Sequence, residues 1–212
     1  MAQPPVEPRF GRAVGLDAVT DERCAVALGA VAGLCWAAAQ RGWMVLIAGR
    51  ESTITWRTGP FVLLPGAIVG AAHGFAAHRR GAGLPVPRWV PWSPLAFAAA
   101  LLEPSAAKQL VTTGIGSGAV FDLLLMMGGG FALRPTRSGA PEPDAVRRVV
   151  GGLVAITVLG QAAAGAVMAG RVSIARGVSG AALGGGLMVL AGLAATLGHD
   201  RPRSAQRGVT PR

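Results

Sequence analysis

Six apolar stretches, separated by short connections that carry arginine, constrain this chain more than any other feature of its sequence. A helix needs ~20 mostly apolar residues to cross the hydrocarbon core of a bilayer. Most of the stretches approach that length, and the connections are too short to bury a core of their own in water. The sequence therefore predicts an all-α, polytopic membrane helix bundle with about six transmembrane helices, at 24–40, 60–78, 89–102, 113–133, 149–170 and 177–198.

Composition supports the same class of protein. Hydrophobic residues make up 51% of the 212 residues, charged residues only 14%, and glycine occupies 32 positions. Nucleic-acid binding requires positive charges that are gathered on one face. Here the positive charges behind the net charge of +10 are spread over loops and tails. We therefore expect the lipid bilayer, and no nucleic acid, as the partner of this chain.

A single membrane domain is predicted over 24–198, between a tail at 1–23 and a basic tail at 199–212. Both tails are polar and contain proline, so we expect them to be disordered and cytoplasmic. The apolar run that ends before Gln40 resembles a cleavable signal peptide. Because the leader would be long and would contain acidic residues such as Asp21, we expect the first span to be retained.

The positive charges predict the orientation of the bundle. With the N-terminus in the cytoplasm, 14 of the 20 basic residues lie in inside segments and 6 in outside segments. The positive-inside rule therefore favours two cytoplasmic termini. Stretch 89–102 is short and contains Pro91 and Pro94, but omitting it as a span removes the charge bias. Residues 41–49 either extend the first helix or lie along the outer interface.

Small residues at four-residue spacing predict where the helices approach one another. In lipid the hydrophobic effect does not drive one helix onto another, and glycines instead let two backbones come close together. Two interpretations stay open: packing within one bundle, and assembly with a second copy or another membrane protein. The residues concerned are Gly66 and its neighbours Gly70 and Gly74, then Gly114 and Gly118, and finally Gly180 and Gly184.

Asp122 is the sharpest candidate for a functional residue. It lies midway along a predicted span, where an acidic side chain costs ~2.5–3.5 kcal/mol to insert and must find a partner. Gln161 has nearly the same predicted depth as Asp122 and shares a helix stripe with Thr157. We therefore expect Gln161 to be the partner of Asp122, with His73 as the second choice. In this candidate intramembrane polar site, Asp122 is either a proton or cation site, or a protonated or hydrogen-bonded core residue that fixes the register of the helices.

Motifs for catalysis, cofactors and metals are not found in the sequence. Cys24 and Cys35 lie too far apart on one helix to form a disulfide, and His73 and His78 fall on different sides of a helix. No nucleophile occurs with a base and an orienting group, so we expect no enzyme, no cofactor and no metal.

The run Gly49-Arg50-Glu51-Ser52-Thr53-Ile54-Thr55-Trp56, followed by Pro60, Leu64-Pro65-Gly66 and Ala77-His78-Arg79-Arg80, resembles a family of small multi-pass membrane proteins of high-GC bacteria. That family has no assigned activity, so the resemblance implies no site residues. It implies a bacterial cytoplasmic (inner) membrane location. We expect an integral membrane protein with a structural or interaction role, or alternatively a small transporter or channel component that uses Asp122 and Gln161.

Overall fold

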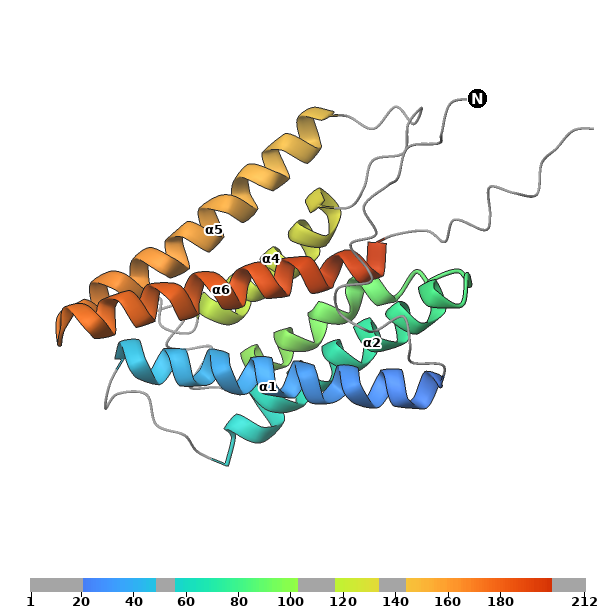
Figure 1. The fold of residues 1–212 in the computed structure, drawn as a ribbon, viewed down its shortest axis with the longest axis horizontal. Helices are drawn as coiled ribbons and strands as arrows, with labels where there is room; N and C mark the ends of the chain where they lie inside the picture. The colour runs from blue at the N-terminus through green and yellow to red at the C-terminus, as the bar shows by residue number, and fades with distance from the viewer. Residues whose placement is uncertain (1–20, 49–55, 103–116, 134–143, 200–212) are drawn as a thin grey trace, which may run out of the picture.

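The structure is a computed structural model that describes residues 21–48, 56–102, 117–133 and 144–199. This part of the chain is helical and contains no strand, which confirms the all-α prediction for these residues. Figure 1 shows the helices lying side by side in one elongated bundle. In chain order they are α1 (Glu22–Ala48), η4 (Gly59–Leu63), α2 (Leu64–Gly81), η5 (Val90–Leu102), α4 (Ser117–Leu133), α5 (Asp144–Gly170) and α6 (Ile174–His199).

Among the described residues, four helices are long and apolar enough to cross a membrane, where the sequence predicts six. They cover Glu22–Ile47, Gly59–Gly81, Ala145–Gly170 and Ile174–His199. The two other predicted spans are also helical, but their described parts are shorter. These parts are the 17 residues of α4 and the 13 residues of η5.

Helix α1 is continuous through the segment whose course the sequence leaves open. Asp21 caps its start, since the backbone N–H of Arg23 donates to Asp21 Oδ1 at 3.0 Å. The helix then runs without interruption to Ala48, so the described residues after 40 extend the first helix. The helix begins at Glu22, two residues before the predicted start of the first span at 24.

Two short segments depart from α-helical geometry where proline interrupts the hydrogen-bond ladder. Pro65 has no N–H to offer the carbonyl four residues before it, and the preceding turn, η4, widens to a π-helix in which Leu64 N–H donates to Gly59 O. Segment η5 tightens instead to a 3₁₀-helix around Pro94. At ~2.0 Å per residue, a 3₁₀-helix of 13 residues spans ~26 Å, more than an α-helix of equal length.

Helices α1 and α2 approach closely through glycines on both sides. A Cβ on Gly70 would lie 2.8 Å from the Cα of Gly33 and would overlap the carbonyl of Gly29. Gly66 and Gly74 meet the same face of α1, so the predicted stripe on the second span lies at this contact. Its counterpart on α1 is a stripe of small residues at four-residue spacing, which the sequence analysis did not single out: Ala25, Gly29, Gly33 and Ala37.

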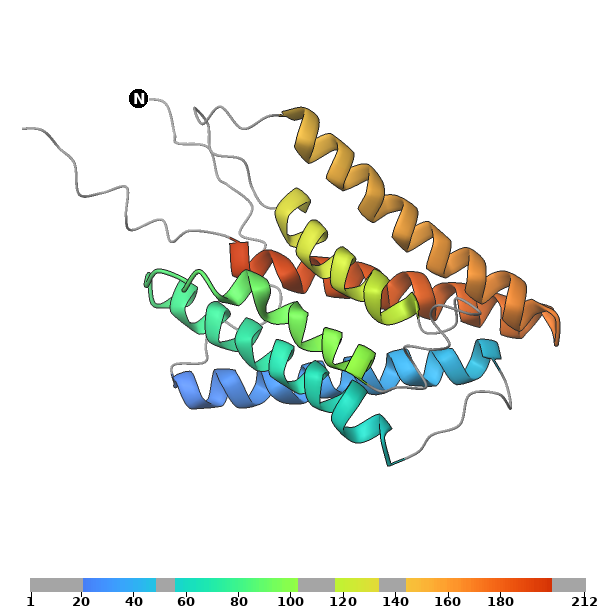
Figure 2. The same cartoon turned by 180° about the vertical axis from the view of Figure 1, so that it is seen from behind.

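Helices α5 and α6 also meet through small residues. A Cβ on Gly180 would lie 2.6 Å from the carbonyl oxygen of Gly165, and one on Gly177 would lie 2.9 Å from the Cα of Gly170. The two helices are joined by a short turn at 171–173, and both views show them converging at this end (Figures 1 and 2). Gly184 contacts two helices, because it faces the main-chain oxygen of Gln161 on α5 and leaves space for the indole of Trp43 on α1.

Successive segments alternate in direction along the bundle. Gly29 faces Gly74 whereas Gly33 faces Gly66, so α1 and α2 are antiparallel. The next segment, η5, reverses again, because its first residue, Val90, packs with Ala76 whereas Phe97 packs with Val69. Helices α4 and α6 run the same way, since Gly129 faces Gly192 and Leu125 shares a buried cluster with Met188. Helix α5 lies antiparallel to both.

The buried core lies where α2, η5, α4 and α6 meet. Leu125 and Met188 are among its most deeply buried side chains. In contrast, α5 turns most of its large apolar side chains outward. Ile156 and Leu159 are each 67% exposed, which in a bilayer is the position of a lipid-facing residue. The same outward placement is found on α1 at Leu28, Val31 and Leu34.

Arginine side chains from neighbouring helices bind the last carbonyls of α4 and α6. Arg147 Nε donates to Ala132 O at 2.8 Å, and Arg80 Nη2 donates to Thr196 O at 3.0 Å. The final carbonyls of a helix have no partner within the helix, and the negative end of its dipole favours a cation there. Charge therefore gathers at the end of the bundle where α2, α4 and α6 end.

Candidate functional site

Asp122 is buried in the interior of the bundle. Its side chain is 3% exposed, and it lies on α4 one turn before Leu125 and Met126 of the buried core. The sequence predicts this burial correctly, because an acidic residue within an apolar span avoids lipid. The structure adds the neighbours that the sequence does not specify.

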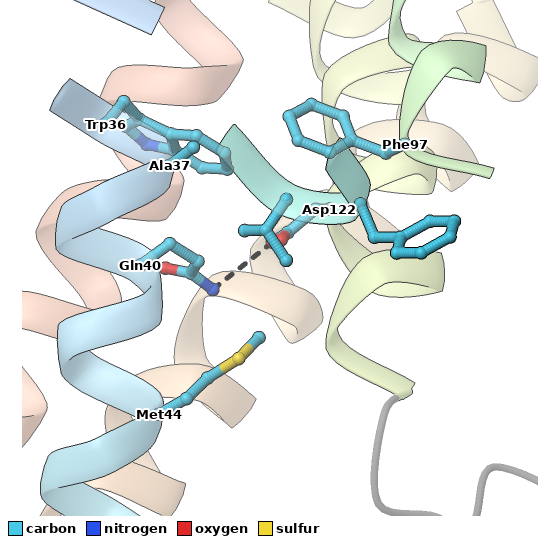
Figure 3. A pocket seen from close by; sticks show the side chains of 8 residues that line it. Trp36, Ala37, Gln40, Met44, Phe97 and Asp122 are labelled. Carbon is cyan, nitrogen blue, oxygen red and sulfur yellow. Dashed lines mark hydrogen bonds between the residues drawn. The ribbon is translucent and has the colours of Figure 1, made fainter. Parts of the chain in front are cut away.

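Gln40 of α1 forms a hydrogen bond with Asp122. Its amide Nε2 donates to Asp122 Oδ1 at 3.5 Å, which is the long limit of a hydrogen bond, and Gln40 itself is 2% exposed. Figure 3 shows the amide pointing from α1 toward the carboxyl group. The prediction that Gln161 is the partner is therefore wrong. It assumed that equal depth in the membrane implies contact, whereas α1, and not α5, faces this side of α4.

A small cleft of about 40 Å³ lies against this pair. Four segments contribute to its wall: α1, η4, η5 and α4. The π-helical turn η4 supplies two of the residues, and such wide turns often occur at functional sites. Besides Gln40 and Asp122, the wall consists of Trp36, Ala37, Met44, Phe61, Val62 and Phe97.

Trp36 and Phe97 close one side of the cleft. Their ring centroids are 5.8 Å apart in an edge-to-face arrangement with an interplanar angle of 65°. Trp36 is fixed from behind, since its indole Nε1 donates to Leu187 O of α6 at 2.9 Å. Trp36 lies one turn before Gln40 on α1, and Met44 lies one turn after it, so this aromatic pair and Met44 lie at opposite ends of the cleft.

The second polar atom of the Gln40 amide is unsatisfied. Gln40 Oε1 is buried and accepts no hydrogen bond from the described residues. A buried polar group without a partner costs about 1–3 kcal/mol. Two kinds of buried acceptor, a carboxyl group and an amide oxygen, therefore lie beside a cleft whose accessible wall is almost entirely apolar.

The other residues of the predicted polar site lie elsewhere in the bundle. Thr157 donates through Oγ1 to Leu153 O of its own helix at 2.9 Å, and the main-chain oxygen of Gln161 faces Gly184. His73 is buried on α2, within electrostatic reach of Arg80 and His199. None of the three is on the wall of the cleft. The predicted four-residue site is thus not assembled; Asp122 alone belongs to the observed one.

The remaining residues singled out in the sequence are two packing glycines and the two cysteines. Gly114 lies outside the described residues, and so do the surroundings of Gly118. Cys24 and Cys35 are free and exposed on α1. Within the described parts of the chain, no group of three or more His, Cys, Asp or Glu side chains could hold a metal ion.

No family model, no curated protein and no solved structure matches this chain. The resemblance to multi-pass proteins of high-GC bacteria therefore stays a prediction, and the function must be argued from the site itself.

Proposed function

We propose that this chain is a six-crossing protein of the bacterial inner membrane with both termini in the cytoplasm. The alternating direction of the six helical segments supports this topology, because each connection must then lie on the opposite side of the bilayer from the last. The length of η5 supports it as well, since ~26 Å approaches the ~30 Å thickness of the hydrocarbon core. Arginines at the end where α4 and α6 end agree with the positive-inside rule.

We further propose that the protein is a small transporter component that binds a small cation at Asp122 and Gln40. The observation that carries this function is the unsatisfied Oε1 of Gln40 beside the long 3.5 Å contact to Asp122. A pair that served only to fix helix register would be expected to satisfy its own hydrogen bonds. Two buried acceptors with unused hydrogen-bonding capacity, beside a cleft, instead provide a place for a positively charged solute.

In this topology the cleft opens toward the outer surface. Met44 lies toward the outer end of α1, and η4 begins the second span at the same side, whereas Trp36, which packs against Phe97, lies about two turns deeper than Met44. The aromatic pair and the core cluster beyond it then close the path to the cytoplasm. This arrangement corresponds to the outward-open state of an alternating-access cycle.

Thiol accessibility tests the proposed path. In a background with Cys24→Ser and Cys35→Ser, we expect Met44→Cys and Val62→Cys to react with a small charged thiosulfonate added from outside. Met188→Cys, at a core position that is 0% exposed, is the matched control and should stay unreactive. Reaction of Met44→Cys no faster than Met188→Cys would contradict an aqueous route to Asp122.

A structural or interaction role is the second candidate, and the exposed face of α5 favours it. Apolar side chains along that helix, including Val149, Leu153 and Val167, are 59–63% exposed. Lipid covers such a face in a monomer, and another membrane protein or a second copy covers it in a complex. Crosslinking in native membranes from Leu153→Cys, in the same cysteine-free background, would distinguish the two.

A further inference from the structure

We infer that α2 and η5 together form a binding surface for one anionic phospholipid, with the lipid phosphate beside Arg79 and an acyl chain along both segments. Both views show the two segments side by side (Figures 1 and 2). The inference does not depend on the cation site at Asp122 and requires only that α2 and η5 lie in a bilayer. The surface, called the α2–η5 face below, consists of Ile68, Phe75, Arg79, Trp89, Trp92 and Leu95.

A basic and two aromatic side chains stack where α2 ends and η5 begins. The rings of Phe75 and Trp89 are stacked, with centroids 6.1 Å apart and an interplanar angle of 14°. The guanidinium carbon of Arg79 lies 5.4 Å from the centroid of the Phe75 ring. Arg79 Nε also donates to Pro85 O at 2.8 Å, which ties the side chain to the connection between the two segments. The stack therefore fixes a cation close to an indole at one end of the α2–η5 face.

The charge at this end of the face is positive. Arg88, which is exposed, adds a second cation next to Trp89, whereas Arg80 reaches α6 on the other side of α2. The sequence from 52 to 102, which includes α2, η5 and their connection, contains no aspartate or glutamate. Indoles and lipid phosphates share the interfacial level of a bilayer. An anionic headgroup at that level would therefore meet cations, and it would meet no carboxylate from this part of the chain.

The rest of the face is apolar and has the length of an acyl chain. In a 3₁₀-helix, side chains three residues apart eclipse one another. Trp89, Trp92 and Leu95 are 55%, 59% and 46% exposed, so they form a straight outward row that leads from indoles to an aliphatic side chain. On α2, Ile68 is 48% exposed and lies eleven residues before Arg79, a distance of ~16 Å along the helix. That depth is about half of the ~30 Å hydrocarbon core, which is the share of one leaflet.

Quenching of tryptophan fluorescence by lipids with brominated acyl chains tests the inference. Trp56, which is 78% exposed at the other end of the second span, is replaced by Phe in every sample, so that Trp89 and Trp92 are the exposed indoles that report. In full-length protein in phosphatidylcholine vesicles, we expect brominated phosphatidylglycerol to bind about three- to tenfold more tightly than brominated phosphatidylcholine. Equal quenching by the two lipids at equal mole fraction would overturn the inference without any change to the face itself.

Charge variants test whether the preference belongs to Arg79. Arg79→Gln should reduce the preference for phosphatidylglycerol about threefold or more, and Arg79→Lys, which keeps the charge, should retain most of it. Arg148→Gln is the matched control, because Arg148 is an exposed arginine at the same end of the bundle but on α5. An equal loss in Arg79→Gln and Arg148→Gln would assign the preference to the overall charge of that end and would contradict a site on the α2–η5 face. A loss in Arg79→Lys as large as in Arg79→Gln would contradict it as well.

Discussion

At the scale of single residues, the indole of Trp43 packs against Gly184, where a larger residue would not fit. Trp43 is 4% exposed, and its Nε1 donates to Gly180 O of α6 at 2.8 Å. A Cβ on Gly184 would lie 2.8 Å from the same nitrogen and 2.9 Å from the main-chain oxygen of Gln161. The glycine thus provides space both for the indole and for α5.

We predict that Gly184→Ala lowers the free energy of unfolding by about 1–3 kcal/mol, because the indole must move and its hydrogen bond is strained. Gly186→Ala is the matched control on the same helix, since a Cβ there would meet nothing within 4 Å. Unfolding with SDS in mixed micelles, followed by tryptophan fluorescence, measures both. Equal stability of the two variants would show that the Trp43 contact does not depend on Gly184.

At the scale of the helix pair, α1 and α2 depend on close backbone approach. In hydrocarbon the pair gains little from burying apolar surface, so van der Waals contact between the backbones must hold it together. The glycines of the two helices face each other, and the backbone of each helix leaves no room for a Cβ at the facing glycines of the other helix.

We expect Gly33→Ala to separate α1 from α2, because its Cβ would lie 2.8 Å from the Cα of Gly70. The melting temperature in detergent should fall by several degrees. A loss of ~1 kcal/mol in the free energy of unfolding lowers the melting temperature of a domain of this size by about 2–4 °C. Gly42→Ala, on the same helix with nothing within 4 Å, should leave the melting temperature unchanged or raise it. A melting temperature for Gly33→Ala equal to that of Gly42→Ala would contradict this role of the glycine contact.

At the scale of the whole molecule, the topology predicts which connections face the cytoplasm. The turn after α5 contains Val172, which is 65% exposed, and the connection after α2 contains Leu84, which is 42% exposed. These two connections lie on opposite sides of the bilayer if each helix crosses it once.

In the cysteine-free background, an impermeant maleimide added to intact cells should label Val172→Cys and leave Leu84→Cys unlabelled. Both should be labelled after the cells are permeabilised, which controls for the reactivity of each site. Labelling of Leu84→Cys alone in intact cells would reverse the proposed orientation. Labelling of both positions in intact cells would mean that the chain crosses the membrane an even number of times between them. That result would exclude the six-crossing arrangement.

The candidate site could be predicted in part. Asp122 is evident from the sequence because a carboxyl group within an apolar span is costly to insert. Gln40 gives a weaker signal, because the first predicted span ends at this residue and an amide at the end of a span is common, whereas α1 in the structure continues to Ala48. The signal that could have found it is the stripe of Ala25, Gly29, Gly33 and Ala37, which shows which face of α1 turns inward.

The sequence by itself determined that the chain forms apolar helices and identified some of the glycines at which they pack closely. Both properties are local, because helix length and the energetic cost of a charge in hydrocarbon depend on composition and spacing along one segment. The tertiary structure decided which helices are neighbours, and therefore that Asp122 meets Gln40 instead of Gln161. Lateral order in a bundle depends on the fit between surfaces of different helices, and no single segment contains that information.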